Sequence, residues 1–284
     1  MGMIIPPSIA MVIYAIAAQQ SVGRMFLGGA IPGILIGVSQ LAIVFIMAKS
    51  HHYPREEVDT SFRGIAEQFR KSIFILLMPL FVVGSVTFGI ATATESAAMG
   101  AVYALVLGAL VLRKLTLKDF YSCLTSSAMT SGKIMMIIAF SQLYVWVLAL
   151  ERIPQMMAGI LISLGMGPTG TMLLIVLAVL VVGTFLDVAP GILLLTPVFL
   201  PAATQLGVSP IQFGVTLVAA LAVGACTPPV GNCLNVCAAV TGFRIGTIFR
   251  GALPWLIGNV IVLVIITIFP QLILWLPDAL MGQP

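Results

Sequence analysis

Long apolar runs, each near the length needed to cross a bilayer, constrain this chain more than any other feature of its sequence. Hydrophobic residues occupy 60% of the 284 positions and charged residues only 8%, whereas about 25% of an ordinary soluble domain is charged. So few charges cannot cover a soluble globule of this size, which excludes a soluble enzyme, a secreted protein and a disordered chain. The sequence therefore predicts an all-α, multi-pass membrane protein, whose lipid-facing surface is apolar as well.

Charged residues and prolines divide the apolar sequence into expected spans and interrupted stretches. Continuous spanning helices are predicted at 25–48, 72–90, 97–112, 128–150 and 252–276. Several prolines cut the stretch 153–203, and we expect 169–200 to be a re-entrant hairpin that enters and leaves on one side. The polar segment 49–71 is expected to hold an amphipathic helix on the cytoplasmic surface, because basic residues concentrate there and at 113–118.

Two segments that lie 222 positions apart align without a gap. The matching pairs are Gly2 with Gly224, Pro6-Pro7 with Pro228-Pro229, and Gly29-Ala30 and Pro32 with Gly251-Ala252 and Pro254. The basic residues place the spans after these motifs in opposite directions, so we expect an inverted repeat, which is typical of secondary transporters. The first copy begins at residue 2. Its earlier half is therefore expected to be missing, as in the C-terminal part of a larger transporter subunit.

The double prolines are expected to end helices inside the membrane. Proline lacks a backbone donor and clashes with the preceding turn, and backbone left unpaired in this way is tolerated only where it lines a cavity or is buried in protein. The freed carbonyl oxygens suit a hard cation, while the N-terminus of the resumed helix favours an anion. Ser8 stands beside the first break, and Thr227, Asn232 and Asn235 stand beside the second. The alternative is a simple kink, with the polar residues bonding between helices.

Asp187 is the only acidic residue deep in an apolar run after Glu151. An Asp at the bilayer centre costs about 2.5–3.5 kcal/mol on insertion scales, so we expect it to have a partner. A bound Na⁺ or a proton would serve, and so would the N-terminus of the helix after Pro190, which Asp187 could cap. The sequence leaves these alternatives open.

Two other charged residues and the four cysteines receive milder interpretations. Glu95 is expected in the first turn of a helix that Thr94 or Ser96 caps. Lys133 is expected near a helix start, where it either reaches the interface or faces a translocation path. The cysteines are expected to be small packing residues rather than metal ligands, because the only two histidines lie far from them; they are Cys123, Cys226, Cys233 and Cys237.

Motifs along nearly the whole chain carry a resemblance to a known family. They are Ile5-Pro6-Pro7-Ser8, Thr94-Glu95-Ser96-Ala97-Ala98 followed by Ala101-Val102-Tyr103-Ala104-Leu105, Asp187-Val188-Ala189-Pro190, Pro197, and Thr227-Pro228-Pro229-Val230-Gly231. The sequence resembles the large membrane subunit, or M subunit, of tripartite ATP-independent periplasmic (TRAP) transporters. That subunit commonly has a Pro where Ala93 stands here, a departure that concerns only local helix geometry.

The resemblance implies a Na⁺-driven importer of the elevator type in the bacterial inner membrane, with a fold like that of the ion transporter superfamily. Its substrate would be an organic acid such as a C4-dicarboxylate or a sialic acid, delivered by a periplasmic binding protein. A small four-helix membrane subunit (Q-type) would complete the scaffold. Na⁺ would be the coupling ion, with no other cofactor, no nucleic acid and no enzymatic activity.

The resemblance also divides the chain into functional parts. The implied transport domain comprises 1–23, the second half of a broken helix of repeat 1, and 153–243, the hairpin and broken helix of repeat 2. The implied scaffold comprises the connecting helices of 24–152, with the cytoplasmic linker 49–71, and the C-terminal helix of 244–284.

Carried onto this chain, the resemblance implies two regions that bind sodium and substrate. One combines the hairpin tip with the second break, and the other uses the first break together with residues expected to precede it. The implied site residues are Ile5, Pro6, Pro7, Ser8, Gly183, Thr184, Asp187, Pro190, Gly191, Gly224, Cys226, Thr227, Pro228, Gly231 and Asn232. One Na⁺ is expected near Asp187 and Thr227, with carbonyl oxygens of Gly183, Cys226 and Gly231 among its ligands.

Three other functions compete with this interpretation. A stand-alone Na⁺-coupled anion symporter of the same superfamily would contain the same breaks but need no small subunit. An intramembrane enzyme is disfavoured. An aspartyl protease needs two membrane Asp residues, and only Asp187 qualifies. The zinc-protease motif HExxH and the serine-hydrolase motif GxSxG do not occur in the sequence. A passive channel would let its substrate through even without a Na⁺ gradient.

Overall fold

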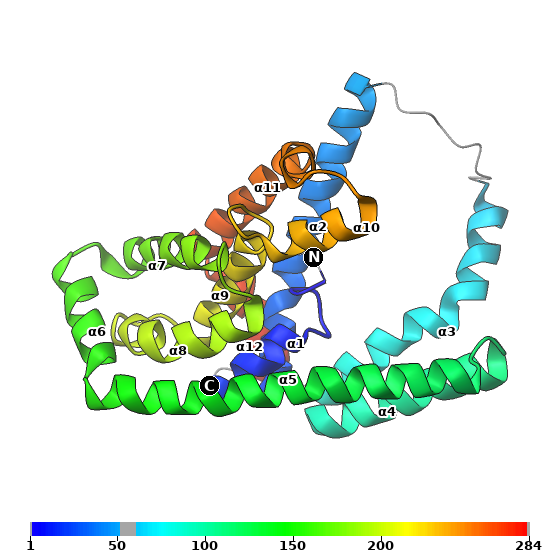
Figure 1. The fold of residues 1–284 in the computed structure, drawn as a ribbon, viewed down its shortest axis with the longest axis horizontal. Coiled ribbons are helices and arrows are strands. Elements are labelled where there is room, and N and C mark those ends of the chain that lie inside the picture. Colours follow the sequence, from blue (N-terminus) through cyan, green and yellow to red (C-terminus); the bar gives the residue numbers. More distant parts are fainter. Residues whose placement is uncertain (1, 52–60, 283–284) are drawn as a thin grey trace. The chain divides into compact units, whose positions relative to one another are not determined.

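A computed structural model describes residues 2–51 and 61–282, and every regular element within those ranges is a helix. In chain order the elements, shown in Figure 1, are α1 (Ile9–Ala17), α2 (Val22–His51), α3 (Phe62–Thr87), α4 (Ala93–Val106), the short π-helix η1 (Leu107–Val111), α5 (Leu117–Leu150), α6 (Ile153–Ser163), α7 (Gly167–Gly183), α8 (Val188–Gln205), α9 (Pro210–Gly224), α10 (Asn232–Thr241), α11 (Ile245–Ile268) and α12 (Gln271–Met281). The predicted all-α fold is confirmed for the described residues.

Five helices in the described part of the chain are long and apolar enough to cross a membrane. They are Val22–Lys49 within α2, Ala93–Val111 of α4 and η1, and the helices α5, α8 and α11. The two parts of α3, Arg63–Arg70 and Ser72–Thr87, are bent by 59° and would add a sixth span if they count as one. This bend separates the polar start of α3 from its apolar remainder. The predicted amphipathic helix on the cytoplasmic surface stays a prediction, and positions 52–60 of its segment lie outside the described residues.

The chain divides into two compact units, Met1–Ile43 with Lys133–Pro284, and Val44–Gly132. In the smaller unit α3 packs against α4. The hydroxyl groups of Ser85 and Ser96, both buried, are hydrogen-bonded at 2.7 Å and join these two helices. The residues proposed to bind ions and substrate all belong to the larger unit.

The helix α4 begins at a capping box. The N–H of Glu95 donates to the Thr92 hydroxyl oxygen, and the Glu95 carboxylate accepts from the N–H of Thr92. The prediction that Thr94 or Ser96 caps this helix is wrong, because a capping box needs the cap three residues before the acidic side chain. The structural role predicted for Glu95 is confirmed.

The helix α5 starts at Leu117, eleven residues before the predicted span. Thr116 and Asp119 explain the early start, because each side chain accepts the backbone N–H of the other, at 3.1 and 3.2 Å. The Ser- and Thr-rich residues that follow, part of which precede the predicted span, all continue the helix. Lys133 therefore lies in the middle of α5 and not near a helix start.

Prolines end some helices and are accommodated within others. The predicted span 252–276 is interrupted, since α11 ends at Ile268 and Pro270 precedes the separate helix α12. By contrast, α8 continues through Pro197 and Pro201, which were expected to interrupt the chain. Pro228-Pro229 lies between the end of α9 and the start of α10, so the predicted break is present there. Pro6-Pro7 precedes α1, the first described helix, so a helix that ends at this pair stays a prediction. Both Pro-Pro bonds are cis.

The helices after the two breaks begin at corresponding positions. Shifted by 222 positions, the first residues of α1 and α2 fall on 231 and 244, one residue before α10 and α11 begin. The sequence alignment therefore corresponds to an alignment of helix boundaries. The opposite direction of the two copies within a membrane stays a prediction.

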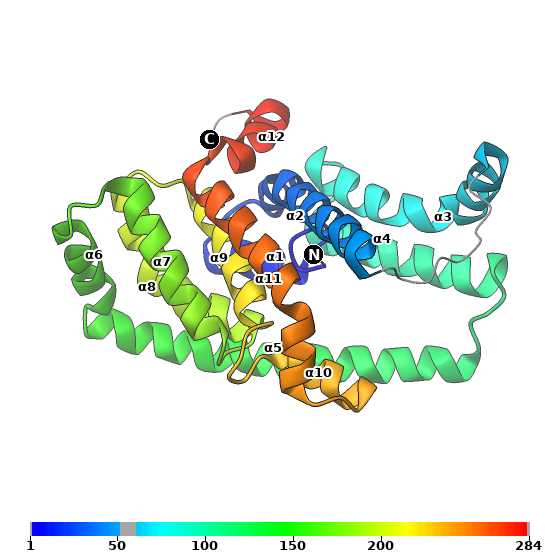
Figure 2. The same cartoon turned by 90° about the horizontal axis from the view of Figure 1, so that it is seen from above.

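In the larger unit, α9 forms the centre of the core. Nearly every residue of α9 is buried, and the helix packs against α1, α7, α8, α11 and α12. Figures 1 and 2 show α7 and α8 side by side as a hairpin, with α9 next to them. Tyr14 of α1 is fully buried here, and its hydroxyl donates to the Pro210 carbonyl oxygen at 2.7 Å. The hairpin and α1 are thus held on one central helix.

We expect Asn259→Ala to lower the free energy of unfolding by roughly 0.6–1.7 kcal/mol, the range for polar pairs between membrane helices. The Gln40 amide of α2 donates to the Asn259 side-chain oxygen of α11 at 2.7 Å, and this pair joins the helices that follow the two breaks. Unfolding in mixed detergent micelles measures the change. If the double variant Gln40→Ala/Asn259→Ala loses as much free energy of unfolding as the two single variants together, the two side chains are not directly coupled.

Candidate functional site

The tip of the α7–α8 hairpin consists of residues 184–187. Asp187 caps α8, because its Oδ1 accepts the backbone N–H of Val188 at 2.9 Å. Thr184 turns its hydroxyl back onto the Val181 carbonyl oxygen at 2.8 Å. Capping, one of the predicted partners of Asp187, is therefore present, and its exposed carboxylate retains a second oxygen.

The second break consists of residues 225–231, between α9 and α10. The Thr227 hydroxyl donates to the Val223 carbonyl oxygen at 3.0 Å, and the Asn235 amide donates to the Val230 carbonyl oxygen at 2.8 Å. The Gly231 N–H donates to the Thr184 carbonyl oxygen at 3.2 Å. This last hydrogen bond ties the break directly to the hairpin tip.

Two glycines bring the hairpin and the break together. A Cβ added to Gly224 would lie 2.8 Å from backbone atoms of Gly183 and 2.9 Å from the Leu180 carbonyl oxygen. The ends of α7 and α9 can approach this closely only because neither residue carries a side chain. Gly191 also lies close to α9, but its added Cβ would meet the Leu221 side chain, at 2.7 Å, rather than backbone.

The first break shares a cavity with the hairpin tip. Ser8 is buried and caps α1 by accepting the Met11 N–H at 3.3 Å, while its hydroxyl donates to the Met3 carbonyl oxygen. Pro7, Ser8 and Asp187 line one cavity of about 310 Å³, together with Gly2, Met3, Ile9, Ala10, Ile13, Val188 and Ala189. The first turns of α1 and α8 therefore reach the same space.

This arrangement can attract both signs of charge. The N-termini of α1 and α8 carry partial positive charge and favour an anion such as a carboxylate. The Asp187 carboxylate and main-chain oxygens favour a cation. Among the hydrogen bonds of the described residues, none ends on the carbonyl oxygen of Gly183 or Cys226, whereas that of Gly231 accepts from Leu234 and Asn235. The first two carbonyl groups keep their capacity for a cation, and the third is engaged in the first turn of α10.

The remaining predicted residues lie around this centre rather than in the cavity. Ile5 is partly exposed and contacts Gly33, and Pro6 is half-buried. Pro190 lines a different groove, between α5 and α8. Asn232 begins α10 and is exposed, and Pro228 is half-buried within the second break. The hairpin tip is thus hydrogen-bonded to the second break and shares a cavity with the first.

Sequence reasoning missed several residues that complete the centre. Ile9 and Ile13 line the cavity, and their spacing of four on α1 is a signal that could have identified them. Cys226 and Cys233 are half-buried at the second break, where the Cys233 N–H donates to the Ala225 carbonyl oxygen at 3.1 Å. These cysteines were interpreted as packing residues; among the described residues no group of three or more His, Cys, Asp or Glu side chains could hold a metal ion.

The sequence matches a family model and several curated relatives. Residues 1–272 match the DctM component of tripartite ATP-independent periplasmic transporters. The chain is 37% identical over 278 residues to the C4-dicarboxylate TRAP transporter large permease protein DctM of Pseudomonas aeruginosa. This alignment covers 98% of this chain and 65% of that protein.

Other relatives carry different substrate names. The sialic acid TRAP transporter large permease protein SiaM of Vibrio cholerae is 34% identical, over 99% of this chain and 66% of its own length. The 2,3-diketo-L-gulonate TRAP transporter large permease protein YiaN of Escherichia coli is 31% identical, over 95% of this chain and 64% of its own length. The chain thus spans about two thirds of these relatives. Because the family model covers nearly all of its residues, the chain belongs to the family of the DctM component of tripartite ATP-independent periplasmic transporters.

Proposed function

We propose that this chain forms part of the permease of a Na⁺-coupled secondary transporter that imports a carboxylate substrate. Family membership and several apolar helices indicate a multi-pass membrane protein. The relatives are named for C4-dicarboxylate, sialic acid and 2,3-diketo-L-gulonate, all of which carry carboxylates. A periplasmic binding protein would deliver the substrate, a small four-helix subunit would complete the scaffold, and the bacterial inner membrane would contain the assembly.

One observation carries the proposal: the hairpin tip is hydrogen-bonded to the second break and lines one cavity with the first. Asp187 shares a cavity with Pro7 and Ser8, while Thr184 accepts a hydrogen bond from Gly231. Helix termini and main-chain oxygens that meet in this way replace hydration of an ion without adding net charge. A carboxylate bound at the N-termini of α1 and α8 would then gain further stabilisation from a nearby Na⁺.

We assign one Na⁺ to the junction of the hairpin tip and the second break. Its ligands are the Asp187 carboxylate, the Thr227 hydroxyl oxygen and the carbonyl oxygens of Gly183 and Cys226. Gly231 drops out as a ligand because its carbonyl oxygen already accepts two N–H groups. With this ion bound, the hairpin and the broken helix would move together against the scaffold, in an elevator motion.

Na⁺-dependent uptake tests this assignment. We expect Asp187→Ala and Thr227→Ala to raise the Na⁺ concentration for half-maximal uptake by about tenfold or more, because losing a hydrogen bond or ligand to a charged group costs roughly 1.5–3 kcal/mol. The measurement uses the transporter assembled with its partner subunits in proteoliposomes. Unchanged Na⁺ dependence in both variants would contradict the assignment.

Two matched controls separate ion binding from folding. Thr241→Ala removes a hydroxyl that donates to the Cys237 carbonyl oxygen, four residues earlier. The Thr227 hydroxyl makes the same kind of bond to the Val223 carbonyl oxygen, but Thr241 lies in α10, outside the break. Glu151→Gln removes an exposed carboxylate at the end of α5. Both should leave Na⁺ dependence unchanged.

Uptake that needs no binding protein and no small subunit would instead favour a stand-alone symporter.

A further inference from the structure

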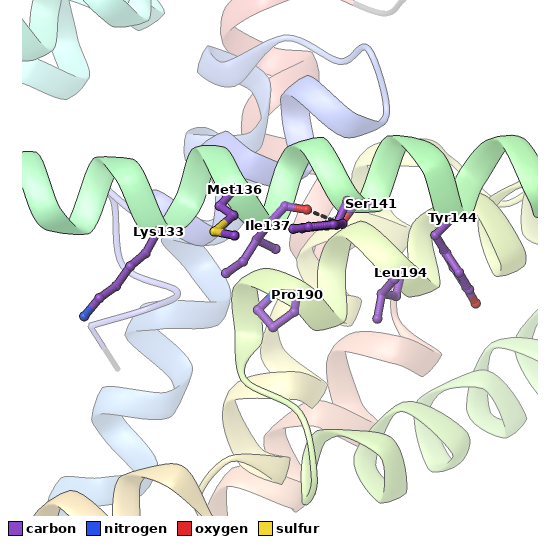
Figure 3. Close-up of a pocket in the computed structure, with 8 residues that line it drawn as sticks. Lys133, Met136, Ile137, Ser141, Tyr144, Pro190 and Leu194 are labelled. Atoms are coloured by element: carbon purple, nitrogen blue, oxygen red, sulfur yellow. Dashed lines mark hydrogen bonds between the residues drawn. The ribbon is translucent and has the colours of Figure 1, made fainter.

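A second cavity lies away from the proposed ion site, between the second half of α5 and the start of α8. This open groove has a volume of about 660 Å³. Figure 3 shows Lys133 and Tyr144 at its two ends, with Pro190 and Leu194 of α8 facing α5 between them. The α5 residues that line it, Lys133, Met136, Ile137, Phe140, Ser141 and Tyr144, recur every three or four positions and therefore share one face of the helix.

The lining of the groove is almost entirely apolar between its two ends. The Ser141 hydroxyl donates to the Ile137 carbonyl oxygen of its own helix at 2.7 Å, so it offers no free donor to a ligand (Figure 3). Within residues 2–51 and 61–282, no hydrogen bond or ion pair ends on the Lys133 ammonium group. The groove thus combines an apolar trough with one unpaired cation at its end, which matches a ligand with an apolar tail and an anionic head.

The length of the groove matches one leaflet of a bilayer. The next charged residue after Lys133 is Glu151, and the helix between them is roughly 27 Å long, close to the ~30 Å hydrocarbon thickness of a bilayer. Lys133 therefore belongs near one interface, and Tyr144 lies roughly 16 Å deeper, near the bilayer centre. A single acyl chain of one leaflet extends over about half the ~30 Å core.

We propose that the α5–α8 groove binds one acyl chain of an anionic phospholipid, whose phosphate pairs with Lys133. The apolar residues of α5, together with Leu194, contact the chain, and the ammonium group neutralises the head group at the interface. The site is separate from the proposed ion site, and the proposal does not depend on Na⁺ coupling. Because Pro190 and Leu194 belong to the hairpin, the bound lipid contacts the same element that carries Asp187.

Native mass spectrometry of the purified full chain, titrated with phosphatidylglycerol or phosphatidylcholine, tests the site. We expect one tightly bound phosphatidylglycerol and weaker binding of the zwitterionic lipid. Lys133→Gln should weaken the phosphatidylglycerol adduct about fivefold, the contribution of one lysine near an anionic surface, while Lys133→Arg preserves it. Lys118→Gln is the matched control, since it removes an exposed cation of the same helix outside the groove.

The outcomes decide the proposal in either direction. Equal binding of the two lipids, or equal losses in Lys133→Gln and Lys118→Gln, would overturn it. Phe140→p-benzoylphenylalanine provides a second measurement in native membranes, because Phe140 lines the groove and is 64% exposed. A photo-cross-link to phospholipid supports the proposal, whereas a cross-link to polypeptide, or none to lipid, shows that another occupant or no lipid fills the groove. Leu194→Trp, which fills the groove, should abolish the lipid cross-link.

Discussion

Gly224→Ala is expected to abolish uptake and to lower the free energy of unfolding by about 2–3 kcal/mol, the cost of overpacking a core. The added methyl group would lie 2.8 Å from the backbone of Gly183. Main-chain atoms cannot rotate away as a side chain can, so α7 and α9 must separate at the point where the hairpin meets the second break. The Gly231–Thr184 hydrogen bond spans this junction and would be lost or lengthened. Unfolding in mixed micelles and Na⁺-dependent uptake measure the two effects.

Gly251→Ala is the matched control for this substitution. Gly251 also lies in a helix, but an added Cβ meets no atom within 4 Å. Alanine should be neutral there, or stabilise by roughly 0.5–1 kcal/mol, because glycine loses more conformational entropy in a helix. If Gly224→Ala and Gly251→Ala had the same effect on stability and uptake, close approach of α7 and α9 would not be required.

Gly214→Ala is expected to destabilise the core by about 3 kcal/mol, at the upper end of overpacking effects. Its Cβ would lie 2.0 Å from the Tyr14 ring. The ring has no room to move, because Tyr14 is fully buried, its centroid lies 6.2 Å from that of Phe213, and its hydroxyl is bonded to the Pro210 carbonyl oxygen. The melting temperature, monitored by tryptophan fluorescence, should fall by several degrees.

A double substitution tests whether Tyr14 causes this loss. Tyr14→Leu alone should destabilise, since it leaves a cavity and removes a hydrogen bond. In a Tyr14→Leu/Gly214→Ala chain the alanine fills part of that cavity, so the double substitution should be less harmful than the sum of the single ones. Strictly additive effects would place the origin of the Gly214→Ala effect elsewhere.

Several parts of the fold could be predicted because local chemistry decides them. The double prolines at 6–7 and 228–229 remove backbone donors and clash with the preceding turn, so no helix continues through them. The start of α5 could also have been predicted from Thr116 and Asp119, but the Ser- and Thr-rich residues after it hid the helix. The break at Pro270 was missed, because prolines are compatible with continuous helices in α2, α8 and α11.

The candidate site was predicted as a set of residues but not as an arrangement. The motifs identified Ser8, Asp187 and Thr227, and nothing in their spacing indicates which of them share a cavity. The structure places Ser8 with Asp187, and it uses the Gly231 carbonyl oxygen for the first turn of α10 instead of leaving it free. Pro190 belongs to the same motif as Asp187 but lines the other groove.

The sequence alone determined that this chain is helical, enters a membrane and interrupts its helices at two repeated double prolines. Those properties depend on apolar composition and on missing backbone donors, which act within a few residues of chain. Only the tertiary structure decided that the backbones of Gly183 and Gly224 approach closely and that the hairpin tip bonds to one break and shares a cavity with the other. It also decided that Lys133 lies at the end of an apolar groove. Such contacts depend on how side-chain volumes fit between distant helices, and no local pattern encodes that fit.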